Sequence, residues 1–197
     1  MRPVIIDSGG ANLASLQYAL ERFGVQAPVT STPGEITKAT HVILPGVGSA
    51  SDAMRRLKTS GVASVLPSLE QPVLGICLGM QLLFTRSEEG ETECLGVIPG
   101  SVRRLRAQPG HPVPHMGWNQ LTIRQRDPLL ERVPENEYVY FVHSYAASVS
   151  EDTVATANYG TDVAAVVRRG NFCGTQFHPE RSGQAGARIL ANFLGVS

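Results

Sequence analysis

The stretch Val73-Leu74-Gly75-Ile76-Cys77-Leu78-Gly79 joins a short apolar run to a helical pattern. Its first four residues predict a buried strand over 73–76, and the apolar spacing that follows predicts a helix over 78–84. Between these elements stands Gly-x-Cys-x-Gly, the form of a tight strand-to-helix turn that presents a nucleophile at the carboxyl edge of a sheet. The positive amino end of the following helix favours a thiolate, so Cys77 is a candidate nucleophile.

The alternative for any free cysteine is a small buried hydrophobe. Cys94 and Cys173 have no comparable setting, so that interpretation applies to them. For Cys77 the strand-to-helix context favours the reactive interpretation. Three cysteines far apart provide neither a disulfide framework nor a paired zinc ligand set, so no metal site is expected.

The segments around this turn alternate between strand and helix patterns. Strands are predicted at 4–6 and 41–44, and helices over 13–23, with Asn12 as the cap, and through Met54 and Leu57. Such alternation predicts an α/β fold with a parallel sheet and helices on both faces. Thr32-Pro33-Gly34-Glu35 has the form of a capping box.

The second half of the chain has a different pattern. The segment Pro99–Pro114 is rich in Pro, Gly and Arg and has no clear period. After it, short strands are predicted, followed by a closing helix over 184–194. The strands are expected at 138–142, 145–149, 154–157, 163–167 and 172–176. Because no repeat or linker separates these segments, residues 1–197 are predicted to form a single domain.

Composition excludes several classes of protein. The chain has 197 residues with 17 Lys+Arg against 17 Asp+Glu, so it lacks the basic excess typical of nucleic-acid binders. No apolar run reaches the roughly 18 residues of a membrane span. The amino end turns acidic too soon for a signal peptide. Together with the odd number of cysteines, these features predict a cytoplasmic protein that binds neither nucleic acid nor membrane.

A candidate base follows the last predicted strand, in Gln176-Phe177-His178-Pro179-Glu180. Residues two apart in an extended segment point to the same side, so Glu180 can hold one ring nitrogen of His178 while the other faces a thiol. Such an arrangement is a catalytic triad, with a nucleophile, a base and an acidic residue that orients the base. The alternatives are a surface His-Glu pair and a metal site, although the second half of the zinc deaminase signature is absent. The chain order argues against α/β-hydrolases, and the lack of a Cys-Gly-x-Cys-Trp segment argues against papain-like enzymes.

A thiolate attacking a carbonyl needs donors aimed at the oxygen that becomes negative. The amide of Leu78 is one candidate. The loop Pro45-Gly46-Val47-Gly48 ends the preceding strand and can supply another, unless it is an ordinary turn. Gln81 lies one helical turn after Cys77, where it can reach a small polar substrate or remain solvated.

Together these motifs resemble the class I, triad-type glutamine amidotransferases. More narrowly, they resemble the family of glutaminase subunits of imidazole glycerol phosphate synthase. The segments that carry the resemblance are Leu44–Gly48, Gly75–Leu83, Pro114–Asn119, Phe141–Tyr145 and Gln176–Ser182. The Cys elbow and the His-Pro-Glu run are typical of the superfamily. Met80 and Pro-His-Met-Gly-Trp-Asn are typical of this subunit.

The resemblance implies a three-layer flavodoxin-like fold around a mixed, mostly parallel sheet. It implies hydrolysis of glutamine to glutamate and ammonia without a cofactor, with Cys77 forming a γ-glutamyl thioester, His178 moving protons and Glu180 orienting His178. Further roles are implied for three groups of residues. These are Val47, Gly48 and Leu78 at the oxyanion; Gly46, Gln81, Glu89, Ser144 and Tyr145 at the glutamine; and Asn12, Trp118, Tyr140 and Arg181 at a partner.

The implied partner is a barrel-shaped cyclase subunit, which forms a heterodimer with the glutaminase and uses its ammonia to make imidazole glycerol phosphate and AICAR in histidine biosynthesis. Ser8, Ala11 and Ala146 depart from residues that are frequent in the family, and none of them occupies a catalytic position. Two alternatives stay open. One is a glutaminase subunit for anthranilate, aminodeoxychorismate or pyridoxal phosphate synthesis, and the other is a non-catalytic scaffold of the same fold.

Overall fold

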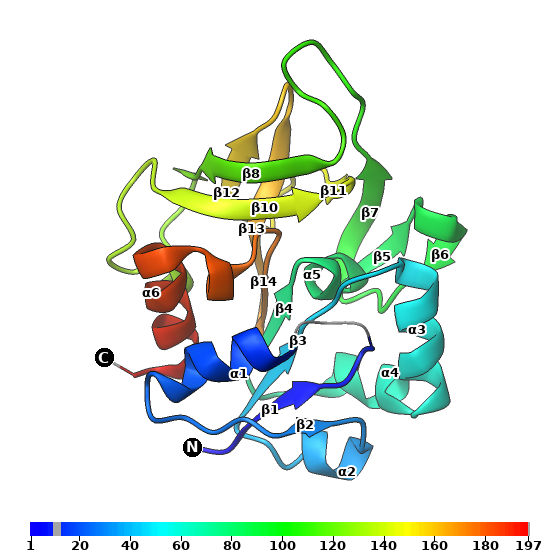
Figure 1. Cartoon of the computed structure of the whole chain (residues 1–197). Coiled ribbons are helices and arrows are strands. Elements are labelled where there is room, and N and C mark those ends of the chain that lie inside the picture. The colour runs from blue at the N-terminus through cyan, green and yellow to red at the C-terminus, as the bar shows by residue number, and fades with distance from the viewer. Residues whose placement is uncertain (10–12, 197) are drawn as a thin grey trace.

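The structure is a computed structural model that describes residues 1–9 and 13–196 (Figure 1). Its main sheet has the strand order β2-β1-β3-β4-β14-β13-β12-β9. The strands from β2 to β14 in this order pair in parallel, and β13, β12 and β9 continue the sheet in antiparallel pairs. The bounds are β1 (Pro3–Ile6), β2 (Val29–Thr30), β3 (His41–Leu44), β4 (Val73–Ile76), β9 (Thr122–Ile123), β12 (Thr153–Asn158), β13 (Asp162–Arg169) and β14 (Phe172–Thr175).

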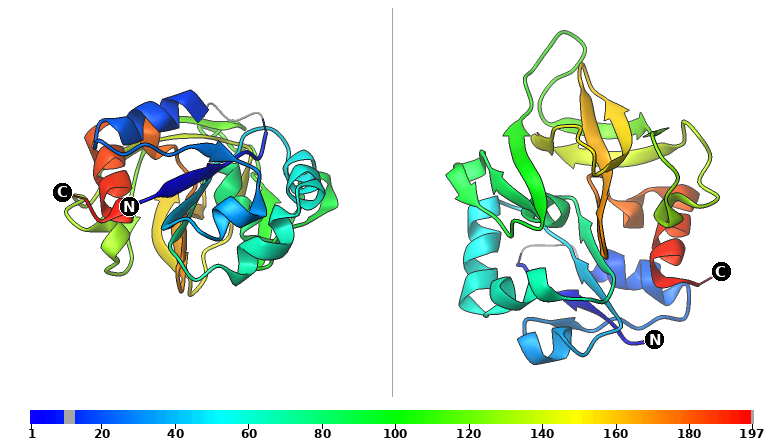
Figure 2. Two further views of the ribbon diagram at one scale, coloured as in Figure 1. Left: turned by 90° about the horizontal axis from the view of Figure 1, so that it is seen from below. Right: turned by 180° about the vertical axis from the view of Figure 1, so that it is seen from behind.

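Helices cover both faces of this sheet, because its parallel strands are apolar on both sides. On one face, α1 (Leu13–Glu21) and α6 (Gly183–Leu194) pack on a core that contains Ile5, Ile43 and Leu74. On the other face the core contains Val4, Ile6, Val42 and Leu44. The helices that cover this second face are α2 (Pro33–Ile36), α3 (Ala50–Thr59), α4 (Val62–Val65) and α5 (Leu78–Leu82). Figures 1 and 2 show α1 and α6 on one side and α3 and α4 on the other, which makes three layers.

Two smaller sheets lie at the end of the molecule opposite β1 (Figures 1 and 2). One is the antiparallel pair β8–β10, and the other has the order β11-β7-β5-β6. Their bounds are β5 (Phe84–Ser87), β6 (Thr92–Glu93), β7 (Ile98–Arg104), β8 (His115–Gln120), β10 (Tyr138–His143) and β11 (Tyr145–Ala147). They extend the molecule beyond the carboxyl ends of β4 and β14.

Three local expectations need correction. The helix after Cys77 ends at Leu82, and Phe84 instead begins β5, because it pairs with Ile98 of β7. Strand β7 extends to Arg104, so it includes the first residues of the segment Pro99–Pro114, in which the sequence shows no hydrophobic periodicity. Thr32 precedes α2, with proline at the first helical position as expected, but its side chain caps no amide.

The Glu35 carboxylate accepts a hydrogen bond from the Thr30 hydroxyl instead, so no capping box forms. The expected cap Asn12 lies outside the described residues. None of the helices that the structure describes is long and apolar enough to span a bilayer.

Candidate active site

Cys77 occupies a strained turn between β4 and α5. Its φ of 53° and ψ of −111° lie in a region that residues other than glycine rarely adopt. The flanking glycines make the turn possible. A Cβ on Gly79 would lie 1.7 Å from the Leu44 carbonyl oxygen, and one on Gly75 would lie 2.7 Å from the Met80 nitrogen. The turn is therefore specified by its two glycines and places the buried cysteine at the carboxyl edge of the sheet.

Strand pairing brings the candidate base to this edge. Thr175 of β14 pairs in parallel with Ile76 of β4, so the residues after both strands emerge side by side. The His178 Nδ1 atom lies 2.8 Å from Glu180 Oε1, in the 3₁₀ turn Pro179–Arg181. Both side chains are nine per cent exposed. The opposite ring nitrogen, Nε2, is buried and has no hydrogen-bond partner among the described residues.

The protonation of His178 follows from its neighbours. Burial by itself lowers the pKa of the imidazole, but the Cys77 sulfur and the Glu180 carboxylate outweigh burial and raise the pKa to about 10. By contrast, burial raises the pKa of the Cys94 thiol to about 11 and that of the Cys173 thiol to about 12. The two other cysteines therefore remain protonated and unreactive at neutral pH.

A cavity of about 350 Å³ opens above Cys77 and His178. Most of the expected oxyanion and substrate residues line it. They are Val47, Gly48, Leu78, Gln81, Glu89, Ser144 and Tyr145. Gly46 is not among them, because it lines a smaller cavity of about 120 Å³ behind His178, together with Glu180 and Arg181. A Cβ on Gly46 would lie 2.9 Å from the Gly79 nitrogen, so close packing against the elbow accounts for this glycine.

The loop 45–48 lies beside the elbow, because Leu44 of β3 pairs with Gly75 of β4. The buried Ser8 hydroxyl donates to the Pro45 carbonyl at 2.6 Å, which ties the start of this loop to the end of β1. The amides of Val47 and Leu78 make no hydrogen bond within the part of the chain that the structure describes. Both amides are therefore without a protein acceptor there, as donors to a substrate oxygen need to be.

Sequence reasoning missed two groups of the site. Gln176 is fully buried, and its Nε2 lies 3.9 Å from the Cys77 sulfur. It stands inside the motif that contains His178, so its position one residue after a strand parallel to β4 was an available signal. His143 also lines the main cavity. It has no neighbouring carboxylate in the sequence, and its partner His115 is 28 residues away, so no local signal marks it.

The expected partner residues gather on one exposed face. The Trp118 ring is 5.9 Å from that of Tyr140, and the Arg181 guanidinium lies 4.5 Å from the centre of the Tyr140 ring. Trp118 and Met116 are 56% and 63% exposed. Exposed aromatic side chains of this kind are enriched at protein interfaces. Asn12, the fourth expected member, lies outside the described residues.

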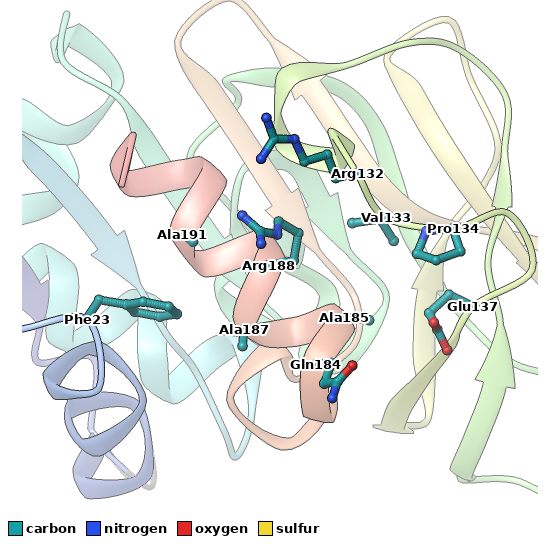
Figure 3. Close-up of a pocket in the computed structure, with 10 residues that line it drawn as sticks. All are labelled: Phe23, Arg132, Val133, Pro134, Glu137, Gln184, Ala185, Ala187, Arg188 and Ala191. Atoms are coloured by element: carbon teal, nitrogen blue, oxygen red, sulfur yellow. The ribbon is translucent and has the colours of Figure 1, made fainter. Parts of the chain in front are cut away.

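Another cavity, of about 410 Å³, lies between α6 and the segment 132–137 (Figure 3). Arg132, Arg188, Glu137 and Gln184 line it together with small and apolar residues. It contains no cysteine or histidine and has no contact with the elbow. No cluster of metal-binding side chains occurs among residues 1–9 and 13–196. The reactive groups are therefore concentrated in the cavity at Cys77.

Comparison with known proteins decides the family. The class-I glutamine amidotransferase family matches residues 4–196. The chain belongs to this family. It is 55% identical over 193 residues to imidazole glycerol phosphate synthase subunit HisH of Xanthomonas euvesicatoria pv. vesicatoria (strain 85-10), covering 98% of this chain and 96% of that protein. It is 53% identical over 190 residues to the protein of the same name from Xylella fastidiosa (strain Temecula1), covering 96% and 95%.

Solved structures confirm the fold of this glutamine amidotransferase. A crystal structure of a glutamine amidotransferase superposes with a TM-score of 0.76 at 19% identity, covering 99% of this chain and 98% of that chain. The structure of PurLQS from Thermotoga maritima superposes with a TM-score of 0.73 at 19% identity, covering 98% and 97%. The predicted three-layer α/β fold with a mixed, mostly parallel sheet is thus confirmed, as is the resemblance to the amidotransferase family.

Proposed function

We propose that this amidotransferase is the glutaminase subunit of an imidazole glycerol phosphate synthase. It hydrolyses L-glutamine to glutamate and ammonia, and the ammonia passes to a cyclase subunit for imidazole glycerol phosphate and AICAR synthesis. One observation carries the proposal: Cys77 and His178 share one cavity, and Glu180 lies 2.8 Å from the far side of the imidazole. The identity with synthase subunits over nearly the whole chain supports the choice of pathway.

Cys77 acts as the nucleophile. Its thiolate attacks the carboxamide carbon of glutamine, and the carbonyl oxygen becomes an oxyanion that the amides of Leu78, Val47 and Gly48 stabilise. Because the pKa of His178 is raised to about 10, the imidazole holds a proton at neutral pH. It gives this proton to the departing nitrogen, so ammonia leaves and a thioester remains.

His178 then acts as the base. The neutral imidazole takes a proton from water, the resulting hydroxide attacks the thioester, and the tetrahedral intermediate collapses to glutamate and thiolate. The restored imidazolium is stabilised by the Glu180 carboxylate on its Nδ1 side. The new γ-carboxyl group then releases its proton to solvent, so glutamine and water give glutamate, ammonia and one proton, and the thiolate and the imidazolium are both restored.

Substrate recognition falls to polar groups around the cavity. Glu89 Oε2 accepts from the Ala50 amide at 2.7 Å, which anchors the carboxylate and leaves its other oxygen for the α-ammonium group. The backbone at Ser144 and Tyr145 faces the same cavity and can hold the α-carboxylate. Gln81 can accept from a donor of the substrate. Gly46 belongs to the loop 45–48 that supplies the Val47 and Gly48 amides, so it contributes through the conformation of that loop and not through contact with glutamine.

The small cavity behind His178 supports ammonia transfer to a partner. It extends from Gly46 and Val47 past His178 to Arg181, which belongs to the exposed face of Trp118 and Tyr140. Free ammonia is mostly ammonium at neutral pH and a poor nucleophile, so it must be transferred without contact with water. We therefore assign Trp118, Tyr140 and Arg181 to the cyclase interface.

The test is a glutaminase assay of the chain alone and with the cyclase subunit and its nucleotide ligand. We expect weak hydrolysis alone and strong stimulation in the complex. Full activity of the isolated chain would contradict partner control. Stimulation by an anthranilate, aminodeoxychorismate or pyridoxal phosphate synthase instead would reassign the pathway. A chain that binds the cyclase but shows no selective reaction of Cys77 with a glutamine-like electrophile would be a scaffold.

A further inference from the structure

Two buried imidazoles beside the cavity take no part in these reaction steps. His115 and His143 are two and six per cent exposed. The His115 Nδ1 atom lies 3.0 Å from His143 Nε2, and His143 Nδ1 lies 2.8 Å from the Tyr145 carbonyl oxygen. The His115 ring is held between the rings of Phe141 and Tyr159, with centroid distances of 4.6 and 3.9 Å. Both imidazoles are therefore held in one orientation.

The partners of these rings determine where the protons are. A carbonyl oxygen can only accept, so His143 Nδ1 carries a proton and donates to Tyr145. The Nε2 atom of neutral His143 must then accept, and His115 Nδ1 donates to it. The remaining His115 nitrogen lies 3.4 Å from Asn119 Nδ2.

The amide of Asn119 has its own fixed orientation. Its oxygen accepts from the Gln120 amide at 2.8 Å, and its nitrogen donates to the Asn158 carbonyl at 2.8 Å. Asn119 therefore presents a donor to His115, which leaves His115 Nε2 without a proton. Asn119, His115 and His143 thus each donate to the next group, the series ends at the Tyr145 carbonyl as acceptor, and both imidazoles are neutral.

The same Tyr145 carbonyl fixes the amide of Gln81. The Gln81 Nε2 atom donates to Tyr145 at 2.7 Å and to Gln176 Oε1 at 3.0 Å. Both hydrogens of the amide nitrogen are therefore used within the protein, and both lone pairs of the Tyr145 carbonyl are occupied. Among the described residues, no hydrogen bond reaches the oxygen of Gln81, which is the part of this amide left for a ligand in the cavity.

We propose that His143, oriented by His115, is a positioning residue for substrate binding. Its Nδ1–H group holds the Tyr145 carbonyl so that Gln81 turns its side-chain oxygen, and not its nitrogen, toward a hydrogen-bond donor of glutamine. The inference rests on the proposed glutaminase function. It also distinguishes the two imidazoles that line the cavity: His178 moves protons, whereas His143 keeps its proton and determines how glutamine binds.

The test compares His143→Asn with His143→Leu in the complex with the cyclase subunit. Asparagine and leucine have similar sizes, but only asparagine places an N–H donor where Nδ1 stood. Both variants leave His115 without its acceptor, so shared structural effects cancel in the comparison. We expect His143→Leu to raise the KM for glutamine about tenfold with kcat within about threefold of wild type, and His143→Asn to keep KM within about threefold. Equal KM values for the two variants, or a loss confined to kcat, would overturn the proposal.

A second measurement needs no variant that might fail to fold. Nitrogen-15 NMR of histidine-labelled wild-type protein in the complex distinguishes protonated from bare ring nitrogens. We expect Nδ1–H and bare Nε2 in both His115 and His143, and the opposite tautomer at His143 would overturn the proposal. A wild-type complex without glutaminase activity would instead contradict the proposed function, while the tautomers could still be read.

Discussion

The imidazole of His178 and the carboxylate of Glu180 are directly paired, with 2.8 Å between Nδ1 and Oε1. The second carboxylate oxygen, Oε2, is buried and has no hydrogen-bond partner among the described residues. The charge of Glu180 is therefore directed at the imidazole rather than shared with other donors. This arrangement stabilises the imidazolium that forms during catalysis.

Replacing Glu180 by glutamine separates charge from geometry. The glutamine oxygen can still accept from Nδ1–H, but the negative charge that raises the pKa of His178 is lost. We expect kcat to fall about 100-fold in the presence of the cyclase, a smaller loss than for His178→Ala. Steady-state kinetics of both variants check this order. An unchanged kcat in Glu180→Gln would show that the charge has no catalytic role.

The buried imidazoles make the fold sensitive to acid. Burial lowers the pKa of His115 to about 4, and the nearby His111 adds to this effect. Burial lowers the pKa of His143 to about 3, where the hydrogen bond to the Tyr145 carbonyl opposes the effect and His115 and His178 add to it. In the unfolded chain these imidazoles take up protons near pH 6.5, so the unfolded state binds more protons as the pH falls below that value. The free energy of unfolding is therefore expected to fall steadily from about pH 6.5 toward pH 4.

Urea unfolding across this pH range measures the effect, with His143→Asn as the control. The variant removes one of the two buried imidazoles, so its stability is expected to depend less steeply on pH. His178 acts in the opposite direction near pH 6.5, because its pKa of about 10 keeps it protonated in the folded state while the unfolded imidazole is only then taking up its proton. Well below pH 6.5 it is protonated in both states and no longer affects the slope. Identical slopes for wild type and variant would show that His143 is not held neutral in the folded protein.

The elbow tolerates no side chain at Gly79. A Cβ there would lie 1.7 Å from the Leu44 carbonyl oxygen, and only a shift of backbone could relieve the clash. We expect Gly79→Ala to destabilise the fold by about 3 kcal/mol or more. The matched control is Gly34→Ala in α2, where a Cβ meets nothing within 4 Å. There we expect no loss or a gain of about 0.5 to 1 kcal/mol in thermal or urea unfolding. Similar effects at both positions would contradict the packing argument.

The exposed aromatic face makes a prediction about the partner. Trp118→Ala removes a large side chain that contacts Tyr140, and we expect a 10- to 100-fold (about 1.4 to 2.8 kcal/mol) weaker Kd for the cyclase. Arg55→Ala on α3 is the control, because Arg55 is exposed and, within the described part of the chain, its one ion pair is with Asp52. Titration calorimetry gives both constants. If the two variants bound the cyclase with equal affinity, the interface would have to lie elsewhere.

Local patterns were sufficient for much of the fold. The elbow could be predicted because its strand, its two glycines and its helix are adjacent in the sequence. The later strands and the last helix also emerged from periodicity, and the position of His178 beside Cys77 follows from parallel pairing of β4 and β14. These features depend on residues that are neighbours or on one general rule for sheets.

Other features depend on distant contacts. Strand β7 forms within a segment that has no period, because β5 and β11 pair with its edges. Phe84 leaves the expected helix for the same reason. The link between His115 and His143 requires the pairing of β8 with β10, which places the two residues directly opposite each other. No pattern confined to a few neighbouring residues contains this information.

The central claim is that Cys77 releases ammonia from glutamine for use by a partner. The direct measurement is product formation by the complex of Cys77→Ala with the cyclase, supplied either with glutamine or with an ammonium salt. We predict no synthesis from glutamine and synthesis at the wild-type rate from ammonium, because the substitution removes only the nucleophile. Loss of synthesis from both nitrogen sources would show that Cys77 is structural, and normal synthesis from glutamine would show that it is not the nucleophile.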